Sequence, residues 1–142
     1  MNEQNFKNHG RYIFLWHIVT TLAILFVLTG SIITFIHSDG NLRHASIMLI
    51  VISLVLAILF WYSRVFALKA QDRAIRAEEN FRHFILTGKP FDKRLRMSQI
   101  VALRFASDEE FSLLAKKAID ENLSSREIKK SIKNWKADHY RA

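Results

Sequence analysis

The sequence predicts an all-α membrane protein: a two-helix transmembrane hairpin, a second helix extended into the cytoplasm, and a short C-terminal helical unit. Two long runs, residues 12–36 and 45–63, contain no Asp, Glu, Lys or Arg. About 20 such residues cross the hydrocarbon layer of a bilayer as a helix. The rest of the chain is basic and amphipathic, and this composition predicts a soluble tail behind the two spans.

A polar segment, residues 1–11, leads into the first predicted transmembrane helix, residues 12–36. Tyr12 and Trp16 form an aromatic pair at its start, where such side chains favour the membrane interface. A buried core helix is one alternative, but 142 residues could not cover two helices that are apolar on every face. A cleaved signal peptide is another, but the apolar run is too long and no A-x-A-like site follows it.

Residues 37–44 read HSDGNLRH and predict an external hairpin loop, because D-G-N is a turn signal. The second transmembrane helix is predicted over residues 45–66, and Trp61 and Tyr62 close its apolar part. In a hairpin these two aromatic residues come level with the aromatic pair of the first span. Small or weakly polar residues would let the two backbones approach: Thr20, Thr29, Gly30, Ser31, Thr34, Ser46, Ser53 and Ala57.

Lys and Arg residues set the predicted orientation. The N-terminal segment carries two of them, the hairpin loop carries one, and the chain from Arg64 onward carries eighteen. Basic residues concentrate on the cytoplasmic side of membrane proteins. We therefore expect both termini in the cytoplasm and the loop outside.

Residues 67–87 are predicted to continue the second span as a cytoplasmic helix, because the next breakers are Gly88 and Pro90. Small and aromatic residues recur along this helix at spacings of three and four, which is a heptad pattern. We call these residues the seam: Ala67, Ala70, Ala74, Ala77, Phe81 and Phe84. The pattern predicts contact with another helix.

The C-terminal unit, residues 88–142, is predicted to contain a short helix at 98–105 and two further helices. Each of these two begins at a predicted capping box, Ser107 with Glu110 and Ser124 with Glu127. The last helix is predicted to bury Ile128, Ile132 and Trp135, and the helix before it one apolar face: Phe111, Leu114, Ala115, Ala118 and Ile119. A unit of about 50 residues is small for an independent fold. We expect it to pack on the seam or on another subunit.

The last predicted helix is strongly basic, with Arg126, Lys129, Lys130, Lys133, Lys136 and Arg141. Binding of this helix to anionic lipid at the inner leaflet would be stabilised by about 1 kcal/mol for each basic residue near the surface. Nucleic acid, an acidic protein face or plain solvent could also explain the charge. Lipid ranks above nucleic acid, which we do not expect as a partner, because the tail is tethered to a membrane.

Residues with catalytic or ligand-binding chemistry are sparse. The chain has no Cys, which excludes disulfides and Cys-based metal sites. His37 and His44 flank the loop without a carboxylate at ligand spacing, and His17 has no partner at its depth for a haem. The acidic run at residues 108–110 suits the first turn of a helix. We therefore predict no enzyme activity, no catalytic residue, no cofactor and no metal.

Several stretches, QNFKNHGRY, FALKAQDRAIRAEENFRHFILTGKP, IVALRFASDEEF and EIKKSIKNWKADHYRA, resemble a family of small uncharacterised bacterial two-span membrane proteins. The family is known only as a domain of unknown function, and ALRFASDEEF is its most recognisable part. The resemblance covers nearly the whole chain. It implies the bacterial inner membrane and supplies no activity or ligand.

The sequence predicts a non-enzymatic, membrane-anchored scaffold or accessory subunit that acts through helix–helix contacts at the seam. We expect a homo-oligomer or a membrane protein complex. One alternative is a lipid- or ligand-responsive membrane module that uses the basic last helix. Another is a small transport or redox subunit, which would require a bound cofactor.

Overall fold

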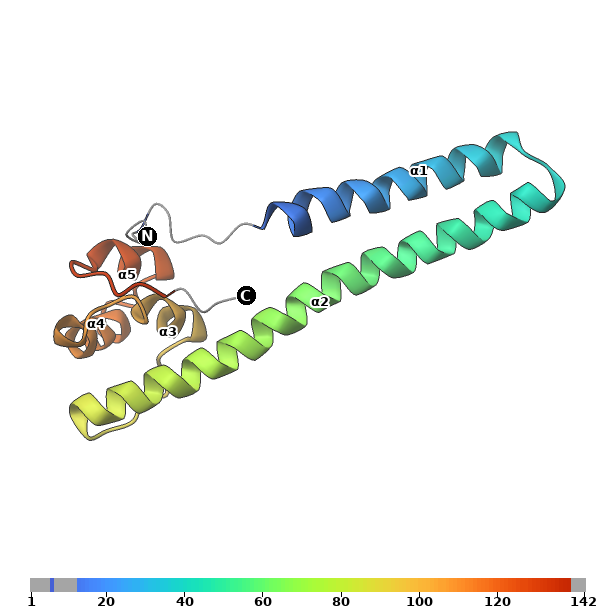
Figure 1. The fold of residues 1–142 in the computed structure, drawn as a ribbon. Helices are drawn as coiled ribbons and strands as arrows, with labels where there is room; N and C mark the ends of the chain where they lie inside the picture. Colours follow the sequence, from blue (N-terminus) through green and yellow to red (C-terminus); the bar gives the residue numbers. More distant parts are fainter. Residues whose placement is uncertain (1–5, 7–12, 139–142) are drawn as a thin grey trace. The chain divides into compact units, whose positions relative to one another are not determined.

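The computed structural model describes Phe6 and residues 13–138, and the described part is helical without a strand (Figure 1). Tyr12, Arg141 and nearly all of the N-terminal segment lie outside it. The elements are η1 (Leu15–Thr20), α1 (Thr21–His37), α2 (Gly40–Thr87), α3 (Met97–Leu103), α4 (Asp108–Asp120) and α5 (Ser125–Ser131). The chain divides between Phe66 and Ala67 into two compact units: a hairpin unit, described over residues 13–66, and a C-terminal unit, described over Phe6 and residues 67–138, which includes the last part of α2.

The hairpin unit contains η1, α1 and the first part of α2. Its first element, η1, is a π-helix, in which the hydroxyl of Thr20 donates to the carbonyl of Leu15 at 3.1 Å. The ring of Trp16 stacks on that of Phe60 with centroids 4.7 Å apart. This contact joins the two helices at the end away from the turn, in agreement with the predicted hairpin.

The turn of the hairpin is shorter than the predicted loop at residues 37–44. Only Ser38 and Asp39 separate α1 from α2, because Ser38 is extended and Gly40 takes a positive φ of 61°. Glycine has no Cβ and adopts this conformation at little cost. Arg43 stacks over the ring of Phe35 with 4.9 Å between Cζ and the centroid, so residues predicted as loop pack as helix.

Three serines, Ser31, Ser46 and Ser53, are the buried residues among the described residues of the hairpin unit. Each hydroxyl donates to a carbonyl of its own helix at 2.7–2.8 Å, so its hydrogen bond is made locally. Ala57 and Thr20 are half-buried. The prediction was wrong for Thr29, Gly30 and Thr34, which lie on the exposed side of α1.

The long helix α2 runs without interruption over 48 residues, as the sequence predicts. It ends at Thr87, and Gly88 follows with a φ of 72°. The N–H of Gly88 still donates to the carbonyl of Phe84 at 2.8 Å. Gly88 thus stops the helix as a left-handed C-terminal cap.

The C-terminal unit has a true apolar core. Large side chains from its short helices and their connections are fully buried: Ile100, Leu103, Phe105, Phe111 and Ile128. Ile75 is the residue of α2 that joins this core. The predicted apolar face of α4 is confirmed, with Ile119 half-buried at its edge.

A buried amide, Gln99, ties the start of α3 to the end of α4. Its Nε2 donates to the carbonyls of Ala118 and Leu123, both at 2.9 Å, and its Oε1 accepts from the N–H of Arg96 at 2.8 Å. A buried amide is stable only when its polar atoms are paired, and these bonds pair both ends of this one.

One of the two predicted capping boxes forms. The hydroxyl of Ser124 accepts from the N–H of Glu127 at 3.3 Å, and the Glu127 carboxylate accepts from the N–H of Ser124 at 2.7 Å. Hydrogen bonding with Ser124 lowers the pKa of Glu127. The predicted box at Ser107 is wrong, because the Ser107 side chain makes no capping bond and Glu110 bonds elsewhere.

The last helix is shorter than predicted. The carboxylate of Glu110 accepts from the N–H groups of Lys133 and Asn134, both at 3.1 Å, so these groups are not available to extend α5 beyond Ser131. The chain then pairs with the segment before α4, through a bridge between Ala106 and Trp135. Ile128 and Ile132 are buried and Trp135 is half-buried, but only Ile128 lies in the helix.

Candidate functional site

The seam lies on α2 and is exposed along its whole length in the single chain. Phe81 and Phe84 keep 65% and 50% of their surface open, although both lie outside the apolar half of α2. Residues 88–142 were expected to pack on the seam or on another subunit. Within the described part, residues 88–138 pack instead on a different face of α2, the face that carries Ile75, Glu79 and Arg82.

Arg82 is the main polar link between α2 and the rest of the C-terminal unit. Its guanidinium donates to Asp108 at 2.7 Å, to the carbonyl of Ala106 at 2.7 Å, and to Glu79 at 3.0 Å. Its Cζ lies 4.2 Å from the centroid of the Phe111 ring. A guanidinium presents several donors in one plane together with a stacking face, so this residue type suits such a junction.

Glu79 is largely buried beside this junction. Burial raises its pKa, and the hydrogen bond and positive charge of Arg82 oppose the increase. The next residue of α2 is Asn80, whose side chain accepts from the N–H of Phe91 at 2.8 Å. One turn after Glu79, the ring of His83 packs at a tilt against Phe91 with centroids 4.7 Å apart, and its Nδ1 lies 2.8 Å from the carbonyl of Lys89. Polar contacts therefore hold the returning chain on this face of α2.

Sequence reasoning missed Arg82, Asn80 and His83. Each is one polar residue in a helix rich in charge, and no spacing separates them from the solvent-exposed Lys69, Arg73 and Arg76. A usable signal was the apolar Ile75, which interrupts the polar residues on that side of α2.

The basic residues predicted to contact lipid do not share one helix. Arg126, Lys129 and Lys130 lie on α5, whereas Lys133 and Lys136 belong to the segment that follows it. Lys129 is half-buried, with its Nζ 5.5 Å from the centroid of the Phe105 ring. The prediction of a single basic helical face was therefore wrong, while lipid contact by these residues stays a prediction.

The histidines and acidic residues that drew attention in the sequence have local partners. Nδ1 of His17, His37 and His44 lies 2.8–3.1 Å from a carbonyl four residues earlier. Asp108 contacts Arg82, and Glu110 holds the chain after α5. Within the described residues, no three His, Cys, Asp or Glu side chains gather as a metal site would require.

An open hollow of about 450 Å³ lies beside α2, and residues of both charges line it, including Glu78, Lys136 and Arg104. Nη1 of Arg104 lies 3.0 Å from the carboxylate of Asp138. The guanidinium of Arg104 also stacks over Phe105 at 4.7 Å. Arg104 thus has an ionic and an aromatic neighbour within the unit.

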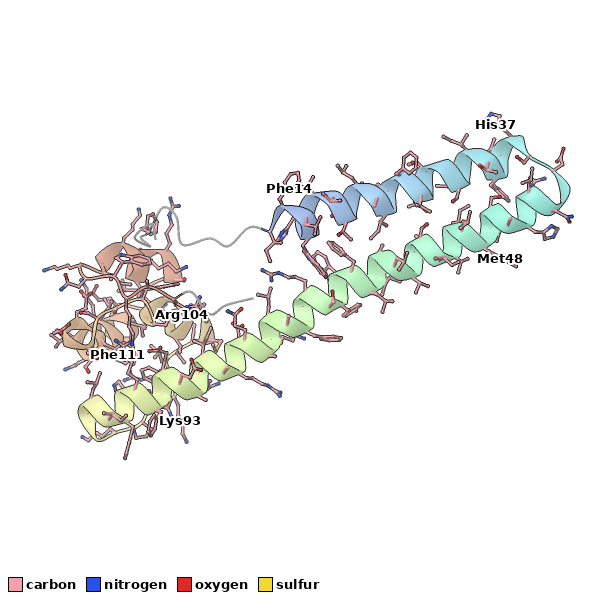
Figure 2. The ribbon with its side chains drawn as sticks, in the orientation of Figure 1. Phe14, His37, Met48, Lys93, Arg104 and Phe111 are labelled. Carbon is pink, nitrogen blue, oxygen red and sulfur yellow. The ribbon has the colours of Figure 1, made fainter. Side chains whose placement is uncertain are left out.

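Two helices, Leu15–His37 counted through η1 and α1, and Gly40–Thr87, are long and apolar enough to cross a membrane by length and composition. Figure 2 labels Phe14, just before η1, and Met48 on α2, and both side chains are mostly exposed. The fold and site therefore define an all-helical protein with two candidate membrane spans and an uncovered heptad seam.

The chain belongs to a family of unknown function (DUF6526), whose profile matches residues 1–142. Comparison with curated proteins gives no match, and comparison with solved structures gives none either.

Proposed function

We propose that this protein is a non-enzymatic, membrane-anchored scaffold or accessory subunit that binds a helix of another chain through its seam. One observation carries the proposal: the C-terminal unit packs on a different face of α2 and leaves all six seam residues exposed. Full burial of a Phe side chain stabilises a contact by about 1.5–3 kcal/mol. Phe81 and Phe84 thus make contact with another helix favourable.

The membrane anchor rests on the hairpin unit. A soluble protein would bury the apolar side chains of two such helices, whereas here none of the described ones is buried, most are exposed, and only small serines are buried. Lipid tails are a suitable surrounding for such a surface. The excess of Lys and Arg after Arg64 favours cytoplasmic termini, and the bacterial inner membrane is the location that the sequence resemblance implies.

Cysteine cross-linking in native membranes tests the proposal. The chain has no Cys, so single substitutions report without background. Ala70→Cys and Ala77→Cys are expected to cross-link to another chain. The matched controls Lys69→Cys and Arg76→Cys lie at nearly the same depth on α2 but off the seam, and both positions are exposed. Their cross-linking is expected to be several-fold weaker.

Asp39→Cys provides the control for insertion, because this residue lies in the turn of the hairpin and is fully exposed. An impermeant maleimide added from outside is expected to label it. Absence of any cross-link at Ala70 and Ala77 in correctly inserted protein would overturn the scaffold proposal. Equal cross-linking at seam and control positions would overturn the assignment of the contact to the seam.

A further inference from the structure

The seam has the arrangement of one strand of a coiled coil. With Ala67 as position a, the a positions are Ala67, Ala74 and Phe81, and the d positions are Ala70, Ala77 and Phe84. Three successive heptads therefore contain no charged residue at position a or d. Four small Ala side chains permit close approach of two backbones, and two Phe layers close the far end.

Apart from Asn80, a g position that accepts from the N–H of Phe91, the residues of α2 that hold the C-terminal unit lie at positions that a coiled coil leaves to solvent. In the same register Ile75 and Arg82 are b positions, His83 is a c position and Glu79 is an f position. These side chains carry the contacts to the core, to Asp108 and to Phe91. A second helix could therefore occupy the seam without displacing the C-terminal unit.

The flanking positions identify the second helix. Arg73 is a g position and Glu78 is the e position of the next heptad, five residues later. Both are exposed, and neither forms an ion pair with another described residue. In a parallel, in-register coiled coil, a g residue faces the e residue of the following heptad on the other strand, and their charges set partner and orientation.

A second copy of this chain supplies the complementary charges. Arg73 of each copy would face Glu78 of the other, which gives two opposite-charge pairs related by symmetry. The other flanking pairs contain no charged residue, so they place no like charges opposite each other: Phe66 with Gln71, and Asn80 with Ile85. An antiparallel pair would match g with g and e with e, and would lose this complementarity.

We propose that the occupant of the seam is a second copy of the chain, parallel and in register, with Arg73 and Glu78 paired across the interface. This inference rests on the proposed function, because insertion in one orientation makes the two α2 helices parallel. It goes beyond that function in naming the partner, the direction and the two charged residues that select it.

Charge reversal in the Ala77→Cys chain tests this inference, with the initial rate of disulfide formation in native membranes as the readout. Arg73→Glu places a carboxylate opposite Glu78 of the second copy, and Glu78→Arg places two cations together. Each variant alone is expected to form the symmetric disulfide roughly three- to tenfold more slowly. The double reversal is expected to restore the rate.

Two differently tagged copies give the sharpest arm of the experiment. When Arg73→Glu and Glu78→Arg chains are co-expressed, opposite charges meet at both sites of the mixed dimer. The mixed disulfide is then expected to exceed either symmetric one. Arg76→Glu, a reversal at an exposed c position, serves as the matched control and is expected to leave the rate unchanged. Proteolysis of the C-terminal unit checks that each variant folds.

The outcomes separate this inference from the proposed function. A seam disulfide whose second chain is a different protein would overturn the inference and leave the scaffold proposal standing. A dimer of this chain that ignores the charge reversals would overturn the parallel register alone. Absence of any disulfide from seam positions would overturn both.

Discussion

The hairpin unit and the C-terminal unit use apolar side chains in opposite ways. In the hairpin unit Phe26 leaves 78% of its surface exposed, and the residues buried among those described are serines. In the C-terminal unit Phe111 is fully buried, and Figure 2 labels it where side chains of the unit are crowded together. One unit thus exposes its apolar side chains and the other buries them, and this contrast supports the proposed membrane location of the hairpin unit.

Some residues of the C-terminal unit depart from its rule. Phe81 and Phe84 of the seam belong to that unit, yet they are exposed in the way of hairpin residues, as are Ile85 and Leu113. A soluble surface rarely leaves neighbouring aromatic side chains open without a partner for them. The comparison between the units therefore draws attention to the far end of α2, where Phe81 and Phe84 are the neighbouring aromatic residues left open.

The largest expected effect comes from truncating one Phe in each unit. Phe111→Ala is expected to destabilise the C-terminal unit by about 3–5 kcal/mol, because it opens a cavity in a packed core. Phe26→Ala is expected to change stability by less than about 0.5 kcal/mol, since the residue is mostly exposed. Thermal unfolding of the purified chain in detergent, followed through Trp135 with Trp16 and Trp61 replaced by Phe, measures the first effect.

Helicity of the hairpin, followed by circular dichroism in the same samples, measures the second effect. A large loss of helicity with Phe26→Ala would break the comparison, because it would mean that the hairpin buries this side chain.

A smaller effect is expected at Arg82. Arg82→Ala removes hydrogen bonds to Asp108 and to the carbonyl of Ala106, and it leaves the largely buried Glu79 without its cation. A loss of about 2 kcal/mol in the unfolding free energy of the C-terminal unit follows. Arg76→Ala on the exposed side of α2 is the control, with a change within about 0.5 kcal/mol. Equal losses for the two variants would show that the junction at Arg82 is not structural.

The smallest effect compares two serines. Ser124→Ala removes the cap of α5 and is expected to cost about 1 kcal/mol in the same unfolding assay. Ser53→Ala in the hairpin unit is expected to be nearly neutral in helicity and in thermal stability, because its hydroxyl bonds only within α2. A clear loss with Ser53→Ala would mean that the serine hydroxyls hold the two helices together.

Local patterns allowed much of this fold to be predicted. The apolar runs, the absence of breakers between Gly40 and Thr87, and the left-handed Gly88 each depend on near neighbours in sequence. The capping box at Ser124 and the apolar face of α4 follow from short spacings as well. Interactions of this range are readable because the residues that make them lie within one or two helical turns.

Choices between distant partners could not be read in the same way. Ser107 and Glu110 have the spacing of a capping box, but Glu110 instead holds residues 133 and 134, more than 20 residues away. The face of α2 chosen by the C-terminal unit depends on Arg82 reaching both Asp108 and Ala106 at once. Which distant partner a side chain contacts depends on the free energies of alternative packed arrangements of the whole unit. The spacing of residues within one helix does not contain that information.

The hydrogen bonds of the buried serines have a mechanical consequence. Ser31, Ser46 and Ser53 each bond within their own helix, so small rotations of α2 against α1 break none of these bonds. At these positions the small size of the serine side chains lets the two helices pack closely, and no serine hydroxyl forms a hydrogen bond between the helices. The packing of α1 against α2 at these serines therefore does not depend on any hydrogen bond of a serine hydroxyl between the two helices.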